Sequence, residues 1–283
     1  MKRIRGVHLV TLRKNLSVSL TGESCYLNCR HCGGKYLKNM SKLDEIPDEP
    51  GRYTSLLISG GVNERGEVPI ELFKDDLRRL KERGYRLNLH TGIIGEKRDL
   101  GFLKYADSVS VELVSSNEII KDVFNADFTV DDYIRTYRTL ENLNVNLHPH
   151  ITLGLDCGRM RHDFKIIDLL EELNPPKLVV NLFIPTLGTE FENCEPPDLE
   201  KVEQFFELLN IRLKNTILFL GCMQPKGRYR EKLQMVALRS GVRVVVKPVE
   251  GLIRMLRENE IEYEEFDECC SFVEVDEVED GTY

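Results

Sequence analysis

Three cysteines near the start of the chain, Cys25, Cys29 and Cys32, stand at C-x3-C-x2-C spacing. Three thiolates this close together can surround one face of a four-iron, four-sulfur cluster, and a set of three leaves one iron free to bind a substrate or cofactor. A structural zinc site is the alternative, with His31 inside the triplet as a further ligand. Such sites usually have a fourth Cys or His and favour C-x2-C pairs, so the spacing predicts an iron-sulfur cluster.

Other polar residues follow or interrupt apolar runs further along the chain. Ser59, Gly60 and Gly61 follow one such run, and Glu112 interrupts another, where burial of a carboxylate without a partner is costly. His148 and His150 are two residues apart, so a strand would direct both imidazoles to one face. We expect these residues to bind ligands, with a structural salt bridge of Glu112 and ordinary structural histidines as the alternatives.

Apolar, β-rich runs alternate regularly with amphipathic stretches, and this pattern predicts the elements that position these residues. The predicted strands are residues 17–21, 53–59, 85–90, 108–113, 145–153, 178–184, 216–220 and 242–247. Helical patterns lie between them, for example over residues 70–80, which gives eight strand and helix pairs. The predicted fold is therefore α/β, a parallel (β/α) barrel of the TIM type, either with all eight units or as a partial, six-unit core. The cysteine segment follows the first strand and belongs at the functional end of such a barrel.

Composition limits the class of protein. The 283 residues carry 39 Lys and Arg against 47 Asp and Glu, a net charge of -8, which disfavours nucleic acid as the main partner. No apolar run approaches membrane-spanning length, and the first residues lack a signal-peptide core, so we expect a cytoplasmic protein without a membrane partner. In a reducing compartment, clustered cysteines favour metal ligation over disulfides.

The end of the chain is strongly acidic from residue 260 onward. We predict a barrel over residues 1–258 and an acidic C-terminal tail over residues 259–283, peripheral or partly disordered. The adjacent pair Cys269 and Cys270 lies in this tail, where it is either idle or able to contribute to an auxiliary cluster. Cys222 follows the seventh predicted strand and is expected at the functional end of the barrel.

The C-x3-C-x2-C segment after a first strand resembles the radical S-adenosylmethionine superfamily, over most of the chain. The resemblance implies that S-adenosylmethionine binds the open iron, that an injected electron breaks its sulfonium bond, and that the resulting 5'-deoxyadenosyl radical takes hydrogen from a substrate. It further implies that His31 packs on the adenine and that Ser59, Gly60 and Gly61 bind the methionyl amine, although Val62 and Asn63 stand where many members carry Glu-Pro.

Further residues have expected roles, that of Glu112 being implied by the resemblance. Glu112 would meet the ribose hydroxyls or the amine of S-adenosylmethionine, and Arg159, with Arg161 beside it, would bind the methionyl carboxylate. His148, His150 and Cys222 would serve the reaction of the substrate.

The second half of the chain resembles biotin synthase in particular, especially residues 181–189, a segment that typically lines the cavity. An archaeal biotin synthase-like group contains one partner of the two-protein lipoyl synthases, sulfurtransferases that insert sulfur into a protein-bound octanoyl chain, and this chain looks like that group. The implied partners are an electron donor such as ferredoxin, a second radical S-adenosylmethionine subunit and a lipoyl-carrier protein, with a second iron-sulfur cluster as a further cofactor. The alternatives are a mutase like 3-methylornithine synthase, in which Gln224 would help to hold an amino acid, another biotin synthase-like cofactor-biosynthesis enzyme, and a noncatalytic iron-sulfur or zinc scaffold.

Overall fold

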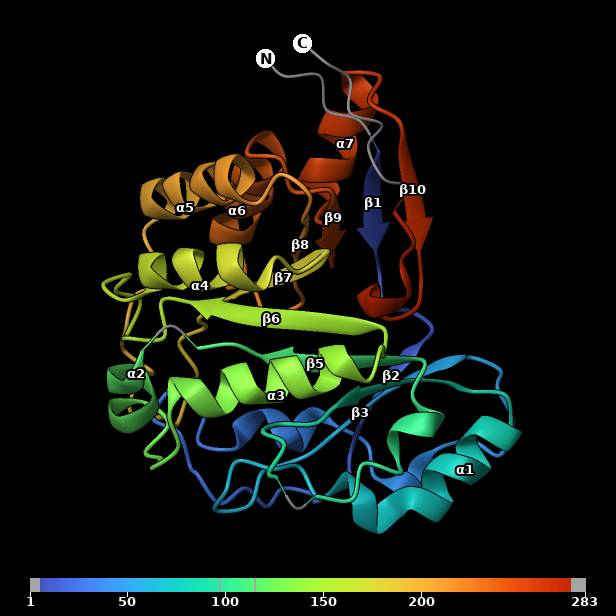
Figure 1. Cartoon of the computed structure of the whole chain (residues 1–283). Coiled ribbons are helices and arrows are strands. Elements are labelled where there is room, and N and C mark those ends of the chain that lie inside the picture. The colour runs from blue at the N-terminus through green and yellow to red at the C-terminus, as the bar shows by residue number, and fades with distance from the viewer. Residues whose placement is uncertain (1–5, 97, 115, 276–283) are drawn as a thin grey trace.

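The ten strands that the described residues form lie parallel in one curled sheet (Figure 1). The computed structural model describes residues 6–96, 98–114 and 116–275. The sheet has the order β10-β1-β9-β8-β7-β6-β5-β4-β3-β2. The strands are β1 (Val7–Val10), β2 (Asn15–Ser19), β3 (Ser55–Ser59), β4 (Arg86–His90), β5 (Ser108–Glu112), β6 (Leu147–Leu153), β7 (Lys177–Leu182), β8 (Ile217–Leu220), β9 (Val244–Val246) and β10 (Tyr263–Phe266). The predicted fold class, a partial parallel barrel of the TIM type, is confirmed.

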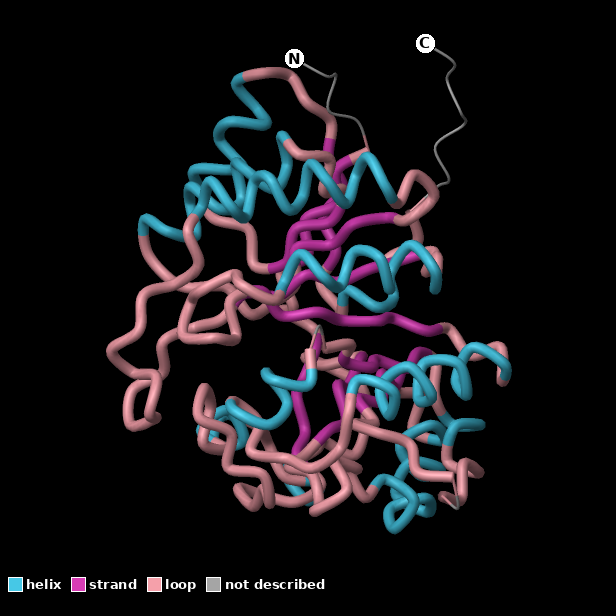
Figure 2. The backbone as a smooth tube through the Cα atoms, turned by 60° about the vertical axis from the view of Figure 1, so that its left-hand side comes forward, coloured by secondary structure: helices cyan, strands magenta, loops and turns pink. Residues whose placement is uncertain are grey.

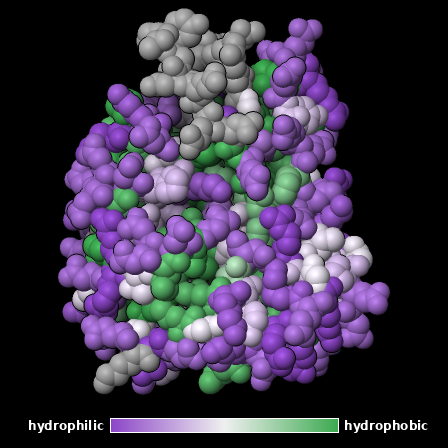
Figure 3. Space-filling view, turned by 45° about the vertical axis from the view of Figure 1, so that its right-hand side comes forward, coloured by the Kyte–Doolittle hydropathy of each residue, from purple (hydrophilic) through white to green (hydrophobic). Residues whose placement is uncertain are grey.

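In the described part of the chain, seven α-helices cover the outer face of the sheet (Figure 2). They are α1 (Lys74–Glu82), α2 (Asn117–Asp122), α3 (Val130–Asn142), α4 (Ile166–Leu173), α5 (Leu199–Arg212), α6 (Arg228–Arg239) and α7 (Glu250–Glu258). Alternation along each strand separates two apolar layers: Val245 belongs to the core under the helices, whereas Val244 and Val246 belong to a smaller cluster on the concave face. Figure 3 shows one side of the molecule, mostly hydrophilic, with hydrophobic side chains gathered in one area.

The eight predicted strands correspond to β2 through β9, with ends that differ by a few residues. Parallel strands buried on both faces are nearly continuous apolar runs, which is why the pattern identified them. The eight strand and helix pairs are wrong in detail, because the described residues of the crossovers after β2 and β4 form only 3-10 helices, at Lys35–Asn39, Leu43–Glu45 and Leu103–Tyr105. The cysteine loop takes up part of the first of these crossovers.

The sequence pattern missed both outer additions to the sheet, β1 and β10. They pair in register with each other, from Val7 opposite Tyr263 to Val10 opposite Phe266. The segment from β10 to Val273 is paired at the edge of the sheet and then buried, so partial disorder does not describe this part of the predicted tail. The division into residues 1–258 and 259–283 stays a prediction, and residues 1–5 and 276–283 lie outside the described part of the chain.

After β10 the chain crosses the concave face at the starts of β4 and β5. We call residues 267–273 the inner segment. Arg86 binds Glu268 at 2.8 Å and its guanidinium lies 4.1 Å over the Phe272 ring, while Ser108 Oγ donates to Ser271 Oγ at 2.8 Å. The backbone NH of Lys14 donates to the Asp267 carbonyl at 2.8 Å. The inner segment therefore connects the two edges of the sheet, whose outer strands β2 and β10 do not pair within the described residues.

Among the helices that the structure describes, none is both long and apolar enough to cross a bilayer. This finding agrees with the absence of long apolar runs in the sequence.

Candidate functional site

The three cysteines lie on one loop at the carboxyl end of β2. Cys29 is buried, and Cys25 and Cys32 are half-buried, so all three thiols are sheltered yet reachable. The loop is fixed through its backbone: the NH of Tyr26 donates to the Val62 carbonyl and the NH of Arg30 to the Val123 carbonyl, both at 2.9 Å. The parallel strand thus delivers the loop to the end of the barrel where such folds bind ligands.

Ligand atoms of Cys29, His31 and Cys32 lie within 4.8 Å of one another. A hydrogen bond between the Cys29 and Cys32 thiols raises the pKa of Cys29 and lowers the pKa of Cys32 to about 4. His31 also lowers the pKa of Cys32. Cys25 is outside this group of three but adds to the shift at Cys29 through its charge. Three thiols on one sheltered loop fit a cluster with three protein ligands, and the closeness of His31 keeps the zinc alternative chemically reasonable.

His31 has an unused polar atom. Its ring lies 5.6 Å from the Phe124 ring, and its buried Nδ1 has no hydrogen-bond partner among the described residues. Buried polar atoms are nearly always paired, so an orphan one is an indication of a missing partner. A bound group beside His31 would supply that partner, and contact with adenine stays a prediction.

The glycine loop after β3 packs directly against the cysteine loop. A Cβ atom on Gly61 would lie 1.9 Å from the Ser24 carbonyl oxygen and 2.6 Å from Cys25 Cα. Its NH donates to Thr21 Oγ1 at 2.7 Å, and a Cβ atom on Gly60 would be 3.1 Å from that same oxygen. Glycine at position 61 is thus required for the position of Cys25 whether or not the loop also binds a ligand.

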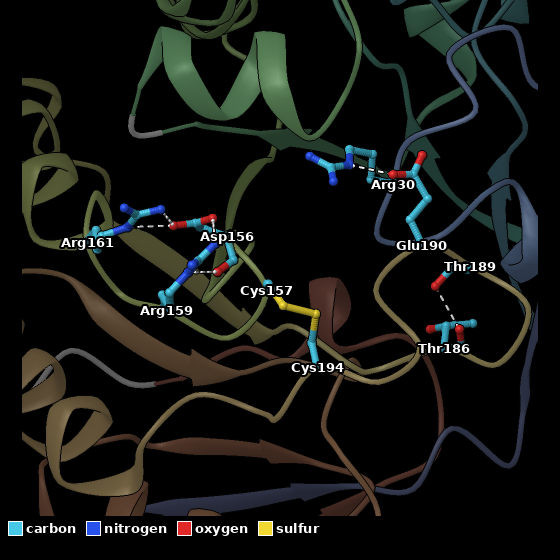
Figure 4. The surroundings of a disulfide bond; sticks show 9 residues. All are labelled: Arg30, Asp156, Cys157, Arg159, Arg161, Thr186, Thr189, Glu190 and Cys194. Carbon is cyan, nitrogen blue, oxygen red and sulfur yellow. Dashed lines mark hydrogen bonds and ion pairs between the residues drawn. A yellow bond between two sulfur atoms is a disulfide. The ribbon is translucent and has the colours of Figure 1, made fainter.

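The segment after β7 contacts the cysteine loop, and Figure 4 shows this contact at the Arg30–Glu190 ion pair. Tyr36 and Thr186 share a hydrogen bond of 3.0 Å, and Arg30 binds Glu190 at 2.7 Å. Residues 181–189, predicted to line the cavity, therefore begin at the end of β7 and continue beside the loop that carries the cysteines.

Arg159 and Arg161 both bind Asp156, at 2.8 and 2.5 Å, and both side chains are largely exposed. Burial raises the pKa of Asp156, but the hydrogen bonds from Arg161 and Arg159 outweigh it and the pKa is lowered. The role of Arg159 at the methionyl carboxylate stays a prediction, and it would require this ion pair to open.

A disulfide joins Cys157, after β6, to Cys194, ahead of α5 (Figure 4). The preference for metal ligation over disulfides applies to clustered cysteines and does not extend to these two, which are 37 positions apart. Figure 4 shows the disulfide between the Asp156 ion pairs and the Arg30–Glu190 pair. The bond therefore ties together two loops at the ligand-binding end of the sheet.

Three polar side chains meet on the concave face where β4 and β5 end beside the middle of β6. Ligand atoms of His90, Glu112 and His150 lie within 4.8 Å of one another, and the two imidazole rings are 5.5 Å apart. Thr152 Oγ1 donates to Glu112 Oε1 at 2.8 Å. The ligand-binding roles of Glu112 and His150 stay predictions, and the trio gains a third member, His90, which the sequence places at the end of the predicted strand 85–90 without assigning it a role.

Burial dominates the protonation of this trio. It raises the pKa of Glu112 to about 7, against the Thr152 hydrogen bond, and lowers the pKa of His90 to about 4. The pKa of His150 is lowered well below its usual range by burial and by the neighbouring histidines. Burial likewise raises the pKa of Tyr133, and the charges of Glu112 and Cys29 add to it, so Tyr133 lies near both groups. Tyr133 is a second residue that sequence reasoning missed.

His148 points to the concave face lower on β6, fully buried edge-on against the Phe219 ring at 6.2 Å. Its Nε2 shares a hydrogen bond of 3.2 Å with Asn146 Oδ1, and its Nδ1 has no partner among the described residues. Burial and Lys177 lower its pKa to about 3. The two predicted histidines therefore have different surroundings, because only His150 belongs to the trio.

The inner segment places Cys269 and Cys270 in an apolar cluster on the concave face. Cys222, which follows β8, packs against the same cluster. A hydrogen bond from Cys270 lowers the pKa of Cys269 to about 6, and the same bond raises the pKa of Cys270. Burial raises the pKa of Cys222, with Cys269 contributing. The prediction that the adjacent pair is idle on a mobile end does not fit these buried neighbours.

Gln224 is not available to a substrate. It is fully buried, donates to the carbonyls of Gly221 and Val246 at 2.6 and 2.8 Å, and accepts from Gln234 at 2.9 Å. The hypothesis that Gln224 lines the cavity is therefore wrong.

Comparisons with known proteins bear on the fold. No protein-family model and no curated protein matches the sequence. Solved structures do: methylornithine synthase (TM-score 0.60, 12% identity, covering 86% of this chain and 72% of that one), the FeFe-hydrogenase maturase HydG from Carboxydothermus hydrogenoformans (0.60, 14%, 91% and 67%) and SuiB from Streptococcus suis (0.51, 12%, 81% and 51%). These neighbours are radical S-adenosylmethionine enzymes. At such identities they show a shared fold and identify no reaction.

Proposed function

We propose that this chain is a radical S-adenosylmethionine enzyme in which Cys25, Cys29 and Cys32 hold a four-iron, four-sulfur cluster. The single observation that carries the proposal is the cysteine loop itself, three sheltered thiols at the carboxyl end of a strand in a fold shared with such enzymes. When bound, the cluster supplies the electron for reductive cleavage of S-adenosylmethionine, which initiates hydrogen abstraction from an unactivated carbon.

The chain's own residues would bind and orient S-adenosylmethionine around that loop. His31 supplies an unpaired nitrogen and a ring beside Phe124 for the adenine. The backbone of Ser59, Gly60 and Gly61 adjoins Cys25 and would meet the methionyl amine. Glu112 and Arg159 are the further proposed contacts, and His148, His150 and Cys222 the proposed substrate residues.

Anaerobic reconstitution followed by reduction with S-adenosylmethionine tests the enzyme class, and the measurement is 5'-deoxyadenosine. We expect cleavage by the intact chain and none by the Cys25→Ala/Cys29→Ala/Cys32→Ala protein, which we call the cluster-free variant. The Cys157→Ser/Cys194→Ser protein is the matched control and should retain cleavage. If the intact chain yields no 5'-deoxyadenosine with or without candidate partners, the proposal fails.

For the reaction itself, we propose sulfur insertion into a protein-bound octanoyl chain, as one component of a lipoyl synthase. Cys269 and Cys270, both buried, and the half-buried Cys222 lie together on the concave face and support this choice, because a sulfur inserter needs a second, sulfur-bearing group. A second iron-sulfur cluster there, reduction by a ferredoxin, and association with a second radical S-adenosylmethionine subunit and a lipoyl-carrier protein belong to this proposal. A cytoplasmic location follows from it.

A mutase like 3-methylornithine synthase is the second candidate. The likeness in fold to methylornithine synthase and the histidines on the concave face favour it, and it needs no second cluster. Iron and acid-labile sulfide in the cluster-free variant distinguish the two. Residual iron together with sulfide supports sulfur insertion, whereas absence of sulfide supports the mutase.

A further inference from the structure

We propose that His90, Glu112 and His150 form a mononuclear site for a divalent transition-metal ion, separate from the cysteine cluster. The three side chains come from adjacent strands β4, β5 and β6. Glu112 is paired in register with His150, and His90 is paired with Ser110, one same-face step before Glu112. Glu112 and His150 therefore lie opposite each other on neighbouring strands, and His90 lies on the next strand, offset by one same-face step.

The shape of the sheet brings the two histidines together. His90 and His150 are separated by the whole of β5, yet their ring centroids are only 5.5 Å apart because both side chains lean over the concave face. The residue between them, Ser110, is small and fully buried, with its hydroxyl donating to Asn88 Oδ1 at 3.1 Å.

The chemistry of the donors fits a borderline transition metal. Two imidazole nitrogens and one carboxylate form a set used for Zn²⁺ and for non-haem Fe²⁺, with positions left open for water or an anionic group of a substrate. Ligands about 2.0–2.2 Å from one ion lie roughly 3–4 Å apart. The present separations, none above 4.8 Å, reach that range with small changes in side-chain torsion.

The half-buried carboxylate of Glu112 has no cationic partner among the described residues. Within the same residues it receives one hydrogen bond, from Thr152 to Oε1. Neither imidazole of His90 or His150 has a hydrogen-bond partner in the described part of the chain. A divalent cation would compensate the carboxylate and use both nitrogens, while Thr152 would orient the carboxylate as an outer-shell partner. All three ligand side chains keep partial access to solvent, which provides an entry path.

This site does not depend on the proposed function, so it is tested in the full-length cluster-free variant. The protein is stripped with a chelator under anaerobic, reducing conditions and titrated with Co²⁺, followed by competition with Zn²⁺. We expect one Co²⁺ per chain, with visible d–d absorption and no thiolate-to-cobalt charge-transfer band in the near ultraviolet. His90→Ala and Glu112→Gln, each in that background, should weaken Co²⁺ binding by at least about 100-fold, and Thr152→Val by about 10-fold.

His148→Gln is the matched control, since it changes a histidine on the same face of the same strand outside the trio, and it should leave Co²⁺ binding unchanged. Circular dichroism and thermal melting verify folding, and His90→Asn replaces His90→Ala where the latter does not fold. The proposal is overturned by absence of stoichiometric Co²⁺ binding, by equal binding in the His90 and Glu112 variants, or by a charge-transfer band that indicates Cys222, Cys269 and Cys270 instead. The proposal is also overturned if Glu112→Gln weakens binding of S-adenosylmethionine while the loss of His90 leaves Co²⁺ binding unchanged, because Glu112 would then serve S-adenosylmethionine alone.

Discussion

The most tightly constrained single position of the site is Gly61, where any side chain collides with the backbone of Ser24 and Cys25. We predict that Gly61→Ala displaces the cysteine loop and lowers the iron bound after reconstitution by at least half, measured as iron per chain. Overpacking of this kind costs about 1–3 kcal/mol. Gly60→Ala is the control, because its Cβ would approach only Thr21, at 3.1 Å, and should bind near-normal iron. Equal iron in the two variants would contradict the argument.

Asp163 carries a pH dependence of stability. Burial raises its pKa to about 6, and its Oδ1 accepts from the Gly154 NH at 2.7 Å. A raised carboxyl pKa means that the folded state holds the proton more tightly than the unfolded state, so stability from this group is present below about pH 4 and is lost as pH rises through about 6. Asp163→Asn keeps the acceptor and removes the titration. Its free energy of unfolding relative to the parent should therefore increase by about 1 kcal/mol from pH 5 to pH 8.

Urea unfolding of Asp163→Asn at the two pH values, in the cluster-free variant, measures this difference. An offset that is the same at pH 5 and pH 8 would show that Asp163 does not titrate in this range.

At the scale of elements, the disulfide connects the loop after β6 to the segment before α5. The two cysteines are 37 positions apart, and closing a loop of that length stabilises a fold by up to about 4 kcal/mol through the unfolded state. We predict that Cys157→Ser/Cys194→Ser melts at a lower temperature than the parent as long as no reductant is present. Addition of a reductant should lower the melting temperature of the parent to about that of the variant and leave the variant unchanged. A parent melting temperature insensitive to reductant would indicate that the bond is not formed.

At the scale of the whole molecule, the two ends of the chain complete the sheet together. β10 pairs with β1, and the inner segment then covers Val10, Val179 and Phe219 on the concave face. We predict that truncation after Glu262 abolishes cooperative thermal unfolding, because it exposes this cluster and removes the Arg86–Glu268 ion pair. Truncation after Val275, which removes only residues outside the described part, is the matched control and should melt like the intact chain.

Strands β2 through β9 could be predicted because each is an apolar run whose side chains are buried on both faces. β10 could not, because its sequence, Tyr-Glu-Glu-Phe, is half acidic and its two glutamates are exposed at the sheet edge. Its strand conformation is decided by hydrogen bonds to β1, more than 250 residues earlier. The burial of Cys269 and Cys270 could not be predicted for the same reason, because it depends on contacts with residues far away in the sequence.

The sequence by itself determined the parallel α/β architecture and the placement of Cys25, Cys29 and Cys32 after a strand, because both are local patterns of spacing and hydrophobicity. Only the tertiary structure decided that His90 joins Glu112 and His150, that Cys157 bonds to Cys194, and that the acidic end of the chain is partly internal. These contacts depend on the curvature of the sheet and on side-chain direction across strands far apart in sequence. No short-range pattern encodes that geometry.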